Sequence, residues 1–145
     1  MKSTAKHHVL LGFDFGTKRI GVAVGQTITR TARPLTTLSA QQGVIQAEAL
    51  QPLIKTWQPD GFVVGIPLNM DGTEQPITHA ARRFAHWLTE TFSLPVHEVD
   101  ERLSTRDARE RIFSEGGYRA LQTAEVDSLA AQIILQNWLD TQEFE

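Results

Sequence analysis

The chain has 145 residues, of which 41% are hydrophobic and 21% charged, and its formal net charge is −3. This length supports one hydrophobic core, so we expect a single domain over residues 1–145. The lack of cysteine excludes disulfide bonds and thiolate metal sites. The net charge gives no general attraction to nucleic acid, so binding of that kind would depend on local cations or bridging metal ions.

The apolar runs are too short to cross a membrane. The first of them is interrupted by Asp14, unlike the continuous apolar segment of a signal peptide. We therefore expect a cytoplasmic protein with no membrane partner.

The first part of the chain predicts a three-stranded meander. Residues 8–15 and 20–25 read as strands, and the turn at 16–19 is so short that the two strands should be antiparallel. A third short strand is expected over 34–38. Alternation along the first strand places Gly12 on the same face as Asp14, where we expect open space for an approaching ligand.

Two strand–helix units and further helices follow the meander. Helical spacing of apolar residues begins at Val44, and Pro76 suits the first turn of the next helix. The expected elements are a helix over 44–57, a strand over 62–66, a helix over 76–88, a strand over 94–99, a helix that starts at Ser104 or Thr105 and ends at Gly116-Gly117, and a last helix over 125–139. The pattern indicates an α/β fold.

Three acidic residues stand where this order predicts the carboxyl edge of a sheet. Asp14 ends the first strand, Glu101 follows the fifth, and Asp127 lies in the first turn of the last helix. A lone buried carboxylate costs several kcal/mol unless it is paired or binds a metal. Asp14 has Lys18 and Arg19 as alternative ion-pair partners.

Glu101 and Asp127 also have simpler interpretations. Glu101 can be a solvated ion-pair partner among neighbouring charges, and Asp127 can favour the positive end of the helix dipole. Taken together, the three acids suit hard divalent cations such as Mg²⁺ or Mn²⁺, and three such carboxylates can hold two ions roughly 4 Å apart for in-line displacement at phosphorus.

Four segments give the chain a family resemblance: GFDFGTKRIGVAVG, VVGIPLNMDGTEQ, VDERLST and VDSLAAQIIL. In this order, they resemble the YqgF/RuvX family of pre-16S rRNA nucleases and Holliday junction resolvases. The resemblance implies a ribonuclease H-like fold, with a five-stranded mixed sheet and helices on both faces. It also gives the three acid roles to Asp14, Glu101 and Asp127, and leaves open whether Asp100 contributes beside Glu101.

The resemblance implies a metal-dependent nuclease that uses Mg²⁺ or Mn²⁺, and we expect two such ions at the acids. The substrate that the resemblance favours is the 5′ end of pre-16S rRNA during ribosome biogenesis, and the alternative is the Holliday junction of DNA. The ribosome is a further candidate partner. RNA and DNA are both compatible with the sequence as substrates, and so are a monomer and a homodimer.

Polar residues near the acids are candidates for binding the substrate. Each can also have a purely structural role in a turn, a loop or a helix end. Asn69, Asp71 and Gly72, for example, are residues typical of a turn. The segment SEGGYRAL combines two glycines, an aromatic residue and a cation, and we expect a flap beside the site or a simple helix stop. The five histidines share no spacing and are expected to be structural. The substrate-binding candidates are Thr17, Lys18, Arg19, Asn69, Arg102, Ser104, Arg106 and Arg119.

Two other classes of function are compatible with the sequence. The segment DFGTKRIGVAV also resembles the phosphate-binding hairpin of the sugar kinase, actin and Hsp70 superfamily, which predicts ATP binding between two such domains. The other class is a non-catalytic RNA-binding factor in ribosome assembly. Intact acids at all three positions favour the nuclease.

Overall fold

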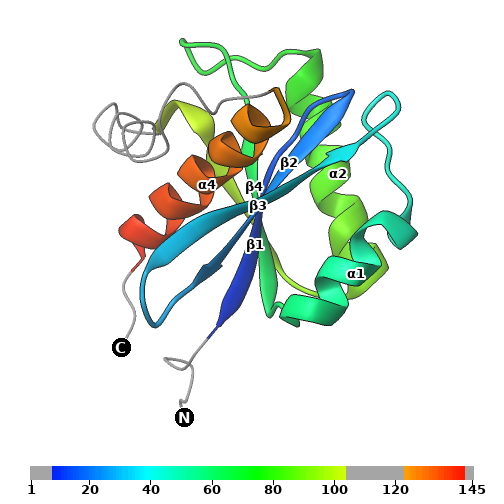
Figure 1. Ribbon diagram of the computed structural model, residues 1–145. Coiled ribbons are helices and arrows are strands. Elements are labelled where there is room, and N and C mark those ends of the chain that lie inside the picture. Colours follow the sequence, from blue (N-terminus) through cyan, green and yellow to red (C-terminus); the bar gives the residue numbers. More distant parts are fainter. Residues whose placement is uncertain (1–7, 104–122, 143–145) are drawn as a thin grey trace.

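The computed structural model describes residues 8–103 and 123–142 (Figure 1). A five-stranded mixed sheet forms its centre, in the strand order β3-β2-β1-β4-β5. The strands are β1 Val9–Asp14, β2 Arg19–Gln26, β3 Thr31–Ser39, β4 Gly61–Ile66 and β5 Val96–Asp100. The helices are α1 Ala47–Trp57, α2 Pro76–Phe92 and α4 Thr123–Thr141, with a 3₁₀ turn, η2, at Glu101–Leu103.

The strand directions confirm the predicted mixed sheet. β1 pairs antiparallel with β2, and β2 pairs antiparallel with β3, as the short connections require. β4 runs parallel to β1 and to β5. The carboxyl ends of β1, β4 and β5 therefore lie at one edge of the sheet.

Helices cover both faces of the sheet (Figure 1). α1 and α2 cover one face, where Leu11, Phe13 and Phe62 lie in the larger hydrophobic core. α4 covers the other face, where Leu10 and Val63 belong to a second cluster. β4 is buried along its whole length, as its uninterrupted apolar sequence predicts for a strand covered on both faces.

Several boundaries differ from those predicted. β3 has nine residues and not five, because it pairs with the whole length of β2. α1 starts at Ala47, and Val44 instead lies in the preceding loop, where it forms an isolated bridge with Gln41. α2 continues to Phe92, whose ring packs against Phe62 and fixes the last helical turn. The helix predicted to end at Gly116-Gly117 lies outside the described residues.

The expectation of open space beside Gly12 was wrong. A Cβ atom added at Gly12 would lie 2.7 Å from Cβ of Leu135, because α4 packs directly on the backbone of β1. Gly25 is covered by the same helix, at Leu135 and Leu139. The glycines on this face therefore allow α4 to approach the sheet closely, and do not leave room for a ligand.

Within residues 8–103 and 123–142, no helix is both long enough and apolar enough to cross a membrane.

Candidate active site

Asp14 lies between two glycines at the carboxyl edge of the sheet. Gly21 of β2 is its direct cross-strand partner. On the other side of Asp14 lies β4. The register between β1 and β4 ends with the pair Phe13 and Val64, and Asp14 and Gly65 are the next residues of the two strands. By strand alternation all three residues face α4. Gly21, Asp14 and Gly65 thus form a row across three strands, in which only Asp14 has a side chain.

The other two acids cover these glycines. A Cβ atom at Gly21 would overlap the backbone carbonyl oxygen of Asp127, so α4 packs directly on β2 at this point. Because α4 starts at Thr123, Asp127 lies in its second turn and not in the first turn that the sequence predicted. A Cβ atom at Gly65 would lie 2.8 Å from Oε2 of Glu101. The sheet therefore places Asp127 on one side of Asp14 and Glu101 on the other.

This arrangement perturbs the titration of Asp14. The pKa of Asp14 is raised from 3.8 to about 7, mostly by burial and in addition by the negative charges of Glu101 and Asp127. Both neighbours are thus close enough to interact with Asp14 through their charge. A carboxyl group with a strongly raised pKa among acidic neighbours is typical of a functional site.

The neighbouring acid Asp100 has a different environment. Nε of Arg102 lies 3.1 Å from each carboxylate oxygen of Asp100, and Nη2 lies 2.6 Å from Oδ2. This guanidinium holds the pKa of Asp100 below its usual value. The geometry separates the two adjacent acids, since Glu101 lies against Gly65 beside Asp14 and Asp100 is held by Arg102.

The sequence comparisons agree with one another. Residues 8–141 match the model of the RuvX family, described as Holliday junction resolvase. The chain belongs to this family. A protein of Haemophilus ducreyi with the name "Putative pre-16S rRNA nuclease" is 52% identical over 131 residues, which cover 90% of this chain and 95% of the relative. A protein of the same name from Yersinia enterocolitica is 53% identical, covering 94% of this chain and 97% of the relative.

The structural comparison shows the fold of this RuvX chain. Thermus thermophilus RuvC, solved in complex with a Holliday junction substrate, superposes with a TM-score of 0.58 at 14% sequence identity. The match covers 90% of this chain and 91% of RuvC. The resemblance to a ribonuclease H-like fold that the sequence indicated is therefore confirmed.

Arg19, one of the described substrate-binding candidates, forms an ion pair with one of the three acids. Its Nε lies 2.7 Å from Oδ2 of Asp127, and both side chains are partly exposed. This ion pair was not anticipated, because the sequence suggested Arg19 as a partner of Asp14. Thr17 and Lys18 are exposed in the adjacent turn. Their side-chain roles remain predictions.

Arg102 connects β5 to the loop between β4 and α2. Besides binding Asp100, it donates a hydrogen bond from Nη1 to the carbonyl oxygen of Met70, at 3.2 Å. In the same loop, Nδ2 of Asn69 donates to Oγ1 of Thr73 at 2.9 Å. Asn69 is exposed, and its predicted substrate contact, like that of Arg102, is untested. Ser104, Arg106 and Arg119 lie outside the described residues.

Gly21 and Gly65 were not predicted as parts of the site. The signal was available, because a glycine inside an apolar strand often marks a close approach of another backbone or of a ligand. Both glycines lie inside strands, in IGVAVG and VVGI. Their meaning depends on the register between β1 and β2 and on the pairing of β1 with β4, which the sequence alone does not specify.

The described histidines have structural surroundings. His97 stacks on Trp138 with ring centroids 4.8 Å apart, and its pKa is lowered by burial. His79 and His86 lie beside Glu74 and Glu90 on or near α2. None of these contacts involves the three acids at the sheet edge.

Proposed function

We propose that this RuvX chain is a nuclease that hydrolyses phosphodiester bonds of structured nucleic acid with the help of divalent cations. The row Gly21–Asp14–Gly65, covered by Asp127 and Glu101, is the observation that carries the proposal. The names of the relatives support pre-16S rRNA as the substrate. The proposal includes a single domain over residues 1–145 that acts in the cytoplasm, with the ribosome as a candidate partner.

Asp14, Glu101 and Asp127 fit a divalent cation by their chemistry. All three offer carboxylate oxygens, the donors that Mg²⁺ and Mn²⁺ prefer. The raised pKa of Asp14 shows that its negative charge lacks compensation in the protein alone. Among the described residues, no three histidine or carboxylate side chains are close enough to enclose an ion. We therefore propose that the three acids form a site that is open to solvent and substrate. Arg19 binds Asp127 on one side of it.

The chemistry divides between the ions and the protein. When bound, one or two such ions supply positive charge that lowers the pKa of an attacking water and offsets charge on the leaving oxygen. Asp14 would hold such ions together with Glu101 and Asp127, the two acids whose charges act on it. Arg19, Lys18 and Thr17 line the exposed turn beside it, where cations and a hydroxyl can bind the phosphates next to the scissile bond.

A cleavage assay tests this function. Wild type and Asp14→Asn are compared on a pre-16S rRNA fragment that retains its 5′ extension, with Mg²⁺, Mn²⁺ or EDTA. We expect cleavage by wild type with either ion, a loss of about 100-fold or more in Asp14→Asn, and none in EDTA. The matched control is Asp140→Asn at the exposed end of α4, which should cleave like wild type. Equal cleavage by wild type and Asp14→Asn would contradict the mechanism.

A second comparison separates Glu101 from Asp100. Glu101→Gln should lose cleavage as Asp14→Asn does, whereas Asp100→Asn should retain most of it, because Asp100 is held by Arg102. If Asp100→Asn lost cleavage and Glu101→Gln retained it, Asp100 and not Glu101 would be the catalytic acid.

DNA junction resolution is the alternative activity. It is favoured by the description of the matching family and by the fold shared with RuvC. A four-way DNA junction in the same assay decides between the two substrates. Faster cleavage of the junction than of the RNA fragment would select the resolvase.

A further inference from the structure

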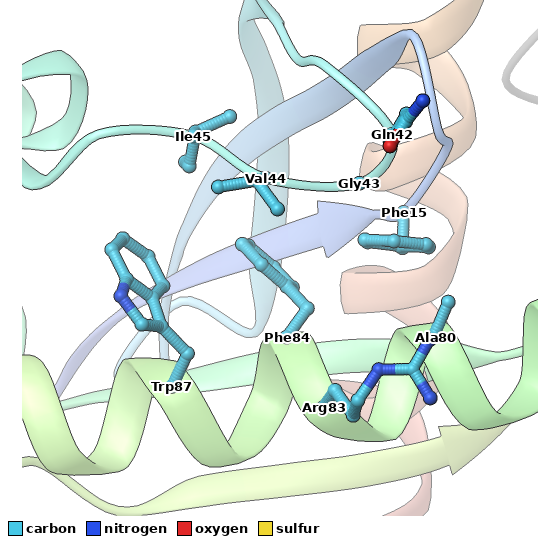
Figure 2. A pocket seen from close by; sticks show the side chains of 9 residues that line it. All are labelled: Phe15, Gln42, Gly43, Val44, Ile45, Ala80, Arg83, Phe84 and Trp87. Atoms are coloured by element: carbon cyan, nitrogen blue, oxygen red, sulfur yellow. The ribbon is translucent and has the colours of Figure 1, made fainter.

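A pocket of about 210 Å³ lies on the face of the sheet opposite to α4 (Figure 2). Residues 42–45, in the loop before α1, form one side, and α2 forms the other. The rings of Phe84 and Trp87 lie nearly parallel, at an interplanar angle of 23° with centroids 5.9 Å apart, and Phe15 packs on Phe84 at 5.5 Å. The volume is below the roughly 300–1,000 Å³ of sites for drug-sized ligands, so the pocket suits a single ring system.

The loop that borders this pocket is fixed by the turn beside the acids. Gly43 adopts a positive φ of 80° and donates a backbone hydrogen bond to the carbonyl oxygen of Thr17, at 2.9 Å. Its position against the ring of Phe15 leaves no room for a side chain. The loop is therefore held in place, and Val44 is left 61% exposed beside the pocket.

Arg83 gives the pocket a positive charge. Its side chain is exposed on α2, and within the part of the chain that the structure describes it has no ion-pair partner. Its neighbour Arg82, by contrast, is paired with Glu74 and Glu98. A guanidinium without a carboxylate partner beside the partly exposed ring of Trp87 suits a phosphate attached to a planar ring.

The pocket lies close to the candidate active site along the chain. Phe15 directly follows Asp14 and points to the opposite face of the sheet, and Thr17 leads to Arg19, which contacts Asp127. A strand that crosses the carboxyl edge at the acids can thus reach the pocket within a short distance.

We propose that this pocket binds one unpaired base of the nucleic-acid substrate. The base stacks on the accessible ring of Trp87, which Phe84 supports from behind, and Arg83 binds a neighbouring phosphate. The inference rests on the proposed function, because it assigns a second contact to the same substrate. The cation favours a nucleotide over the apolar side chain of a protein partner.

The test measures binding of a short single-stranded oligonucleotide that carries one 2-aminopurine base. The full chain with Asp14→Asn is used, so that the probe is not cut. The same oligonucleotide with an abasic position in place of 2-aminopurine is the competitor, and ribose and deoxyribose versions distinguish RNA from DNA. We expect quenching of 2-aminopurine on binding, and an affinity about fivefold or more weaker for the abasic form.

Two pairs of variants locate the binding. Val44→Glu places a negative charge at the pocket, and its control is Ile28→Glu, a residue that is 59% exposed in the turn between β2 and β3. Arg83→Gln removes the cation, and its control is Lys55→Gln on the exposed side of α1. The two pocket variants should lose quenching and affinity, and the two controls should match the parent protein.

The outcomes separate this inference from the proposed function. Equal affinity for the base-containing and abasic probes would overturn the proposal that the pocket binds a base, and so would unchanged quenching in Val44→Glu. The pocket would then suit an apolar side chain of a protein partner. This conclusion would hold even if cleavage still depends on Asp14. Quenching that is lost in the pocket variants supports base binding in the pocket. If the wild-type protein cleaves neither RNA nor DNA, only the proposed nuclease activity is overturned.

Discussion

At the scale of single residues, the charge state of Asp14 dominates the site. The carboxyl group has a pKa of about 7 in the folded chain and 3.8 in the unfolded chain. Between these values the folded protein retains a proton that the unfolded chain has lost. The free energy of unfolding therefore falls as the pH rises from about 4 to about 7, and it stays low above that range.

Asp14→Asn should therefore stabilise the protein in EDTA at pH 8. Replacing the buried charge by an amide of similar size should raise the free energy of unfolding by roughly 2–4 kcal/mol, the order expected for a shift of about three units. The gain should vanish near pH 4, where the wild-type carboxyl is neutral. Urea denaturation at both pH values measures it.

Two comparisons control this experiment. Asp140→Asn on the exposed end of α4 should change stability by less than about 0.5 kcal/mol at either pH. Equal stability of wild type and Asp14→Asn at pH 8 would mean that Asp14 is not buried among uncompensated negative charges.

Gly65 offers a way to move Glu101 without removing its charge. In Gly65→Ala the new methyl group meets Oε2 and Cγ of Glu101 and Cδ1 of Ile134, at 2.6–3.0 Å. These are side-chain atoms that can shift, so we expect a modest loss of stability but a fall in cleavage rate of up to about 100-fold, since small displacements of catalytic groups are costly.

Kinetics of RNA cleavage beside thermal melting measure both effects of Gly65→Ala. A variant that melts early and still cleaves at the wild-type rate would show that the position of Glu101 is unimportant.

At the scale of elements, the close approach of α4 to the sheet determines where Asp127 lies. Gly12, Gly21 and Gly25 all face this helix, and an added Cβ at any of them would meet its atoms. At Gly21 the obstacle is backbone, which cannot move aside like the end of a side chain. The helix and β2 would have to separate.

Gly21→Ala should therefore destabilise the fold by about 3 kcal/mol or more, at the upper end of the range for overpacked positions. Gly61→Ala is the matched control in β4, because its nearest contacts are the milder 3.2 Å to the carbonyl oxygen of Pro95 and 3.3 Å to Leu10. Chemical denaturation of both variants tests the difference. Equal losses would contradict the close packing of α4 on β2.

The elements show which features the sequence could predict. The strands of the sheet were predicted because apolar runs are local patterns, whereas the catalytic role of the three acids stays a prediction. The start of α1 was misjudged, since Val44 continues the helical spacing but forms a bridge with Gln41 in a loop. The pairing of Arg19 with Asp127 joins residues 108 positions apart, and no local pattern reveals such a contact.

At the scale of the whole molecule, the negative charge concentrated at one edge links metal binding to stability. Any ligand that binds only the folded chain stabilises it, by about 2.7 kcal/mol when its concentration is 100 times the dissociation constant. Mn²⁺ should therefore raise the melting temperature of wild type and have little effect on Asp14→Asn. The control adds KCl to the same ionic strength, and equal shifts in the two proteins would argue against a specific site.

The contact between Gly21 and Asp127 also determines when the site can form during translation. During translation the β1–β2 hairpin leaves the ribosome about 100 residues before α4, at the usual rates of synthesis several seconds earlier. Until α4 docks on Gly21, the nascent chain has Asp14 but lacks the neighbouring acid Asp127. We expect ribosome-bound chains truncated before residue 123 to lack cleavage activity, so that a nuclease synthesised among ribosomal RNAs becomes active only after its last helix has folded.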